Sequence, residues 1–169
     1  KESSAERIAA LARPYYASLV GEQPEPDVSA WLDKIIAMLA ASVDRLEQLP
    51  EKARLIFNYD AKVALASPDN AEVLAGQHTD AVLARFLFKV LEDESAREKR
   101  LTPEQFKKIV TEVKAETGAK GKELFHPIRI AVTGFHSGPE FDKLIPILEQ
   151  GSCLPIPSQV LSVRERVEE

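Results

Sequence analysis

The chain of 169 residues lacks several features that would restrict its function directly. Its single cysteine, Cys153, excludes an internal disulfide and cannot build a zinc site alone, so we expect it to be a small buried side chain. No apolar run approaches the roughly 20 residues that a membrane-spanning helix needs. The start, KESSAERIAA, lacks the apolar stretch of a signal peptide. We therefore expect a cytoplasmic protein without a membrane partner.

Recognisable catalytic motifs are also missing. The sequence has no phosphate-binding glycine loop, no CxxC pair and no Ser-x-Gly nucleophile turn. The histidines His78, His126 and His136 do not have metal-ligand spacing, and we interpret them as scattered surface or capping residues. We expect no catalytic residue, no metal site and no cofactor in this chain.

The charge balance is acidic, with a net charge of -5. Because phosphate binding usually goes with a basic surface, this balance argues against DNA as a partner and requires a local basic cluster for any other nucleic acid. The hydrophobic fraction of 44% is enough for a real core, and the length fits one domain or two small subdomains.

Apolar residues recur at spacings of three and four nearly throughout, which is typical of amphipathic helices. No run alternates with period two for long enough to indicate a sheet, so the predicted fold is all-α. The predicted helices cover residues 29–46, 81–95, 102–118, 141–151 and 156–167. Turn-rich breaks separate them, and we expect two small helical subdomains, residues 1–95 and 96–169.

The helix over residues 102–118 has the clearest end signals. Thr102 is its predicted N-cap, Pro103 takes the first helical position, Gln105 completes a capping box, and Gly118 ends the helix. Elsewhere the signals are weaker. Thr79 is a plausible cap for the helix over residues 81–95. Pro146 should kink or shorten the helix that follows Pro139.

One segment, KGKELFHPIRIAVTGFHSGPEF (residues 120–141), stands out because it combines basic residues, a histidine and repeated breakers. It resembles a segment near the C-terminus of bacterial glutamyl-tRNA synthetases, which share its Lys-Gly-Lys start, its Pro-x-Arg-x-Ala-x-Thr-Gly core and its Gly-Pro-Glu. The segments ARPYYASLVG (12–21) and WLDKIIAMLAASVDRLEQLPEKARLIF (31–57) resemble helices of the same domain. The resemblance covers about residues 8–168.

The resemblance implies an anticodon-binding domain whose fold is an all-helical cage in two subdomains. The HIGH-type and KMSKS-type motifs of the catalytic half are not in the chain. It thus implies a piece of a larger, monomeric ligase that joins glutamate to its tRNA with ATP and Mg. The implied partner is a glutamate-specific tRNA. The acidic balance motivates an alternative, a helical protein-interaction domain that has lost RNA binding.

Anticodon bases are unstacked, so a protein can read their edges and faces with arginine, aromatic rings and helix N-termini. Two candidates have a structural alternative: Phe141 also fits an apolar core stripe, and Arg129 could be an ion-pair partner. We interpret Thr133-Gly134 as a helix stop. The candidate anticodon-binding residues are Ser42, Arg45, Arg54, His126, Arg129, Gly138, Pro139 and Phe141, and the candidate phosphate contacts are Lys52, Lys120 and Lys122.

Ser42 is a departure from the family. The resemblance places it where members that separate glutamate tRNA from glutamine tRNA have an arginine, which is thought to read the third anticodon base. A serine hydroxyl is too short for the bidentate reach of a guanidinium. One hypothesis is a relaxed enzyme that charges both tRNAs. The other is that Ser42 lets two helices pack closely while Arg45 discriminates.

Overall fold

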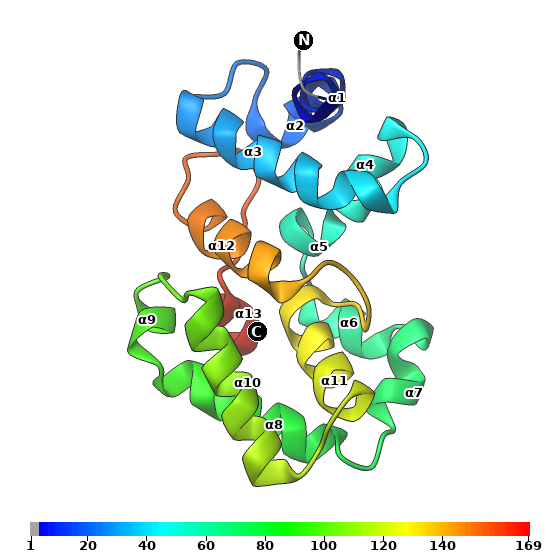
Figure 1. Ribbon diagram of the computed structural model, residues 1–169, viewed down its shortest axis with the longest axis vertical. Helices are drawn as coiled ribbons and strands as arrows, with labels where there is room; N and C mark the ends of the chain where they lie inside the picture. Colours follow the sequence, from blue (N-terminus) through cyan, green and yellow to red (C-terminus); the bar gives the residue numbers. More distant parts are fainter. Residues whose placement is uncertain (1–3) are drawn as a thin grey trace.

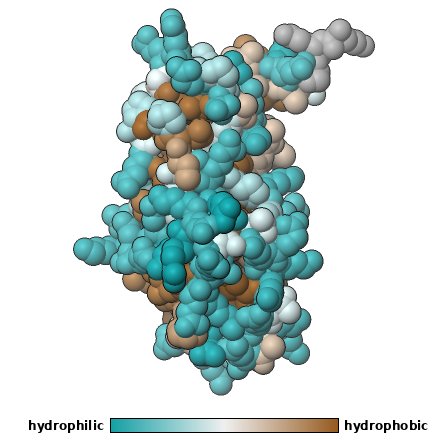
Figure 2. Space-filling view, turned by 90° about the vertical axis from the view of Figure 1, so that its left-hand side faces the viewer, coloured by the Kyte–Doolittle hydropathy of each residue, from teal (hydrophilic) through white to brown (hydrophobic). Residues whose placement is uncertain are grey.

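The computed structural model describes residues 4–169, and every regular element in this range is helical. The prediction of an all-α fold is confirmed. No helix within the described range is long and apolar enough to cross a membrane. Figure 1 shows an elongated molecule with one group of helices above and a second group below a central helix. The face in Figure 2 is mostly hydrophilic, with smaller apolar patches.

The upper group holds the N-terminal part of the chain. Its longest member, α3 (Pro26–Leu39), begins with proline at the first helical position and packs against α1 and α12. The other helices of this group are α1 (Ser4–Ala12), α2 (Ala17–Val20), α4 (Leu49–Lys52) and α5 (Arg54–Phe57). Short 3-10 turns occur at Arg13–Tyr16, Ala40–Ser42 and Leu46–Gln48.

The lower group is built around α8 (Thr79–Glu92), which packs against α10 (Pro103–Thr117) and α11 (Lys122–Thr133). The shorter elements of this group are α6 (Ala61–Ala66), a 3-10 turn at Pro68–Asn70, α7 (Ala71–Leu74) and α9 (Glu94–Arg97). The division into residues 1–95 and 96–169 stays a prediction. The helices α8 and α10, which lie on either side of it, contact each other.

The central helix α12 (Phe141–Gly151) joins the two groups (Figure 1). The indole N–H of Trp31 on α3 donates to the carbonyl oxygen of Ile147 at 2.8 Å. A Cβ on Gly151 would come within 2.4 Å of the Trp31 ring, so glycine lets the two helices approach closely. As a result, buried apolar side chains from both groups form one continuous core.

Two buried charged side chains hold the short C-terminal helix α13 (Val163–Glu168). Glu149 on α12 accepts the N–H groups of Leu101 and Val163. Arg166 is 1% exposed, and burial lowers its pKa to about 10, so it stays charged at neutral pH. Its guanidinium donates to the carbonyl oxygens of Leu55, Ile56, Val132 and Leu161.

The clearest end signals in the sequence are confirmed. The Thr102 hydroxyl accepts the N–H of Gln105 at 3.2 Å, and the Gln105 side chain accepts the N–H of Thr102 at 2.9 Å. Gly118 follows α10 in the left-handed conformation, with a φ of 73°. Gly134 ends α11 in the same way, with a φ of 83°. The interpretation of Thr133-Gly134 as a helix stop is therefore correct.

The first long helix is shorter than predicted. It ends at Leu39 rather than at Leu46, because the chain tightens into a 3-10 turn and Val43 is extended, with a φ of -129°. The Ser42 hydroxyl donates to the carbonyl oxygen of Leu39 at 2.6 Å. This bond satisfies one of the free carbonyl groups at the helix end and competes with continuation of the helix. Val43 and Leu46 pack on the core from outside α3.

Two other local predictions are wrong. Thr79 does not cap α8; it is the first helical residue, and its hydroxyl donates to the carbonyl oxygen of Val73. Pro146 does not shorten α12, which continues to Gly151, and the kink expected there stays a prediction. Cys153 is exposed rather than buried.

The predicted C-terminal helix over residues 156–167 begins later, at Val163. Pro157 has no N–H to donate to a helix, so the preceding segment is irregular. The helix starts only where Ser162 and Glu165 form a capping box.

Candidate functional site

The loop between α11 and α12, residues 134–140, is anchored near both of its ends. The buried side-chain amide of Asn70 donates to the carbonyl oxygen of Gly134 at 2.9 Å and to the end of α6. The guanidinium of Arg129 donates to the carbonyl oxygen of Pro139. These bonds fix the backbone of the 134–140 loop relative to both α7 and α11.

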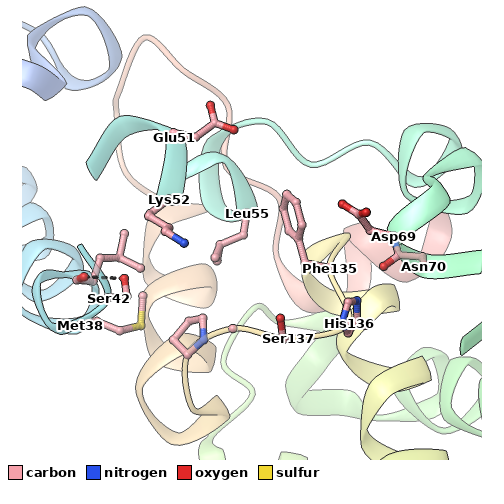
Figure 3. Close-up of a pocket in the computed structure, with 13 residues that line it drawn as sticks. Met38, Ser42, Glu51, Lys52, Leu55, Asp69, Asn70, Phe135, His136 and Ser137 are labelled. Carbon is pink, nitrogen blue, oxygen red and sulfur yellow. Dashed lines mark hydrogen bonds between the residues drawn. The ribbon is translucent and has the colours of Figure 1, made fainter. Parts of the chain in front are cut away.

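The 134–140 loop forms one wall of a cleft of about 560 Å³, which we call the main cleft. The facing wall comes from the end of α3 and from α4 and α5 (Figure 3). Lys52 points its ammonium group into the space between the walls, and Leu55 gives an apolar surface beside it. Phe135, which is 45% exposed, lies across from them with its ring open to solvent. The main cleft thus combines a cation, an exposed aromatic ring and loop backbone.

Some of the predicted site residues meet in the main cleft: Ser42, Lys52, Gly138 and Pro139. Its lining also includes the carboxylates of Glu51 and Asp69. Arg54 does not line it, and its guanidinium forms an ion pair with Glu51 at 3.0 Å. Both members of this pair are exposed, so its contribution to stability is small.

Arg129 and Phe141 lie in a second groove, of about 470 Å³, between α10 and α11. The guanidinium carbon of Arg129 is 4.3 Å from the ring centroid of Phe141. Phe141 also packs against Phe106, with ring centroids 4.7 Å apart, so it supports the core as well as the arginine. Burial lowers the pKa of Arg129, but a guanidinium remains charged. The partner that the structure records for this arginine is a backbone carbonyl.

His126 lies in a third cleft, of about 430 Å³, together with His78 and His136; we call it the histidine cleft. The ring centroids of His126 and His136 are 5.4 Å apart. His78 Nε2 lies 3.7 Å from a carboxylate oxygen of Glu123. Lys122, a predicted phosphate contact, lines the same cleft. His136 also lines the main cleft, so the two clefts meet at this side chain.

The remaining predicted residues, Arg45 and Lys120, are exposed and line none of these three clefts. No group of three or more metal-ligating side chains within residues 4–169 is placed to hold an ion.

Sequence reasoning missed several residues of the main cleft. Phe135 and His136 stand inside the segment that carries the family resemblance, but neither has a spacing that indicates an exposed position. Asn70 fixes the loop from a turn more than sixty residues away, and no local pattern identifies that contact. Met38 belongs to the stripe of α3, where it resembles any other core residue.

Comparison with protein families identifies the family of this chain. The chain matches the model of the anticodon binding domain family over residues 7–155, a range that contains every residue of the main cleft. The chain therefore belongs to the anticodon-binding domain family.

Among curated proteins, the relatives of this domain are glutamate–tRNA ligases. Glutamate–tRNA ligase 1 of Caldicellulosiruptor saccharolyticus is 31% identical over 156 residues, which cover 91% of this chain and 31% of the relative. The glutamate–tRNA ligase of Bacillus pumilus is 33% identical over 157 residues, which cover 88% of this chain and 30% of that ligase. That of Desulforamulus reducens is 27% identical over 152 residues.

The chain spans about three tenths of the length of these relatives. It is an anticodon-binding domain homologous to glutamate–tRNA ligases, as the sequence resemblance implied. No solved structure matches the chain.

Proposed function

We propose that this domain binds the anticodon loop of a glutamate-specific tRNA as part of a glutamate–tRNA ligase. The observation that carries the proposal is the main cleft of about 560 Å³, which lies between the two groups of helices and is bounded by the anchored 134–140 loop. The family match and the similarity to glutamate–tRNA ligases support the choice of tRNA.

The contents of the main cleft suit an unstacked base and its backbone. The exposed ring of Phe135 offers a face on which a base can stack, an interaction of about 1–3 kcal/mol per base. Lys52 places a positive charge where a phosphate would lie. Gly138 has no side chain, so the loop backbone is open to a base edge. Lys52 is the cation of the lining, and the carboxylates of Glu51 and Asp69 lie in the same cleft, so the cleft as a whole is not basic.

In this proposal, ATP and magnesium bind to the rest of the ligase, which also carries out the ligation. The domain acts as a monomer that positions the tRNA, and the residues of the main cleft bind RNA without a catalytic role.

We further propose that the ligase separates glutamate tRNA only weakly from glutamine tRNA. Ser42 lines the main cleft, but its hydroxyl already donates to Leu39, so it offers an incoming base only acceptor lone pairs. Arg45, the alternative reader, is exposed in a turn outside the cleft. This arrangement supports the relaxed hypothesis over discrimination by Arg45.

A gel shift with the isolated domain tests the proposal. We expect it to retard a glutamate-specific tRNA more than an unrelated tRNA, and Phe135→Ala to weaken the complex while an exposed aromatic elsewhere, Tyr15→Ala, leaves it unchanged. Equal retardation of both tRNAs, or none, would contradict the proposal. Loss of all RNA binding by a well-folded domain would favour the alternative, a helical protein-interaction domain.

A further inference from the structure

All three histidines of the chain line one cleft, although they are far apart in the sequence. His78 directly precedes α8, His126 lies in α11, and His136 lies in the 134–140 loop. The histidine cleft adjoins the main cleft, because both are lined by His136 and Asp69. Figure 3 shows His136 and Asp69 on the same side of the main cleft. A strand that fills the main cleft can therefore continue into the histidine cleft.

The net charge of the histidine cleft changes sign when its histidines are protonated. With neutral histidines, its lining has three carboxylates and one ammonium group, a net charge of -2. Protonation of all three imidazoles changes this to +1. The charged groups other than histidine that face the cleft are Asp69, Glu72, Lys122 and Glu123, and Arg129 acts on it from the same face of α11.

The charges are not spread evenly. The carboxylate of Glu123 lies 3.7 Å from His78. Burial lowers the pKa of His126, and the charges of His136, Lys122 and Arg129 lower it further. All three neighbours that act through charge are cations or become cations on protonation. Together with the 5.4 Å distance between the two rings, this defines a corner whose charges repel one another unless an anion lies among them.

We propose that the corner between His126 and His136 binds a backbone phosphate of the RNA strand whose base occupies the main cleft, and that binding takes up protons. This inference rests on the proposed function. Two imidazolium rings and Lys122 supply N–H donors to phosphate oxygens, and charge-assisted bonds of this kind are the strong ones. Asp69 and Glu72 repel the same phosphate in either state of the histidines, so binding needs the imidazolium charges to offset them.

Proton uptake fixes the direction of the effect. If the complex holds more protons than the free partners, its affinity rises as the pH falls through the imidazole range. We expect RNA to bind about tenfold more tightly at about pH 6 than at about pH 8, which corresponds to a net uptake of roughly half a proton over this interval. Low salt is required, because phosphate contacts are screened by ions.

The experiment measures binding of a labelled anticodon stem-loop by fluorescence anisotropy at both pH values. His126→Gln and His136→Gln remove the charge but keep a polar side chain, and each should flatten the pH profile. His78→Gln should have a smaller effect, because the Glu123 carboxylate beside that ring repels a phosphate. The control Lys34→Gln, on α3, removes an exposed positive charge and should leave the ratio of the two affinities unchanged.

Inorganic phosphate separates an RNA strand from a free anion as the ligand. The imidazole proton resonances of His126 and His136 should shift on addition of RNA, and inorganic phosphate should reproduce this only at far higher concentration. Equal responses to both would overturn the assignment to RNA. Tight RNA binding that is the same at both pH values, or that keeps its pH dependence in both glutamine variants, would overturn this inference and leave the proposed function standing. Absence of RNA binding at either pH would overturn both.

Discussion

Arg129 and Arg166 make the same two kinds of contact in opposite settings. Each donates to backbone carbonyl oxygen and lies over an aromatic ring, Phe141 at 4.3 Å and Tyr59 at 4.7 Å. Arg166 is 1% exposed and bonds to four carbonyl oxygens, whereas Arg129 is half-buried and bonds to one. The N–H donors of Arg166 bond to carbonyl groups of the core, so this arginine stabilises the fold. Arg129 has one recorded hydrogen bond, so its other N–H donors remain for a ligand.

The position of Arg166 explains how a buried cation persists although none of the ion pairs recorded within residues 4–169 includes it. Leu55 and Ile56 are in the last turn of α5, and Val132 is near the end of α11. The carbonyl groups at a helix C-terminus are free and carry a partial negative charge. One guanidinium from α13 therefore satisfies the ends of two helices that belong to different parts of the chain.

The largest effect is expected when the buried arginine is removed. Arg166→Met keeps much of the volume but leaves several buried carbonyl groups without a donor. We expect it to lower the free energy of unfolding by about 3–5 kcal/mol, because each buried carbonyl group left without a donor costs about 1–3 kcal/mol. Urea denaturation followed by circular dichroism measures this, with Arg97→Met on the exposed surface of α9 as the control. A loss as small as that of the control would show that the carbonyl groups find other partners.

Replacement of the half-buried Arg129 should affect tRNA binding more than it affects stability. We expect Arg129→Ala to weaken tRNA binding by about 1–3 kcal/mol, the worth of a bidentate contact, while the helical signal stays largely intact. Stability should fall less than in Arg166→Met, because one recorded hydrogen bond and one ring contact are lost. Arg97→Ala is the matched control for binding. Equal effects of the two substitutions, or unfolding of Arg129→Ala, would assign Arg129 a structural role.

An arginine introduced at position 42 should increase the preference of the ligase for glutamate tRNA. Ser42→Arg places a guanidinium at the edge of the main cleft, at the cost of the hydroxyl bond to Leu39. In the intact ligase we expect it to raise the preference for glutamate tRNA over glutamine tRNA about tenfold, or roughly 1.4 kcal/mol. Charging assays with both tRNAs measure the ratio. A strong preference already present in the unmodified ligase would contradict the relaxed hypothesis.

The sequence predicts one of these two arginines and misses the other for a physical reason. Arg129 stands in a run of family-like residues that ends at a glycine, so both its helix and its neighbourhood are predictable from local pattern. Arg166 resembles a solvated residue in a short charged helix. Three of its four partners, Leu55, Ile56 and Val132, lie 34 to 111 positions away, and no local pattern reports contacts at that separation.

The same limit applies to the clefts. Ser42 and Lys52 could be placed near Gly138 only through the family resemblance, and the structure brings these three together. The convergence of the histidines in one cleft, and the role of Asn70 as the anchor of the loop, depend on how α7 packs against α11. Helix ends were predicted correctly at the Thr102 capping box, at Gly118 and at Gly134, but not at the capping box of Ser162 and Glu165. They were not predictable at Leu39, where a side-chain hydroxyl competes with the backbone.

The smallest expected effect concerns the pKa of His126, which Arg129 lowers and Arg166 does not. Burial lowers the pKa of His126 first, and the positive charges of His136, Lys122 and Arg129 lower it further, whereas Arg166 does not contribute. An imidazole is charged when protonated, so removing a positive neighbour makes protonation easier. We therefore expect Arg129→Met to raise the pKa of His126, and Arg97→Met to leave it unchanged, in a nuclear magnetic resonance titration of the ring protons.

The pKa of His126 in the folded domain lies below the unfolded value of about 6.5. The domain therefore keeps its full stability above about pH 6.5, and loses some of it as the pH falls through the pKa of His126 in the folded state. This loss should be smaller in Arg129→Met than in the unmodified domain. An unchanged pKa in that variant would mean that solvent screens Arg129 from His126, and the two arginines would then differ in burial alone.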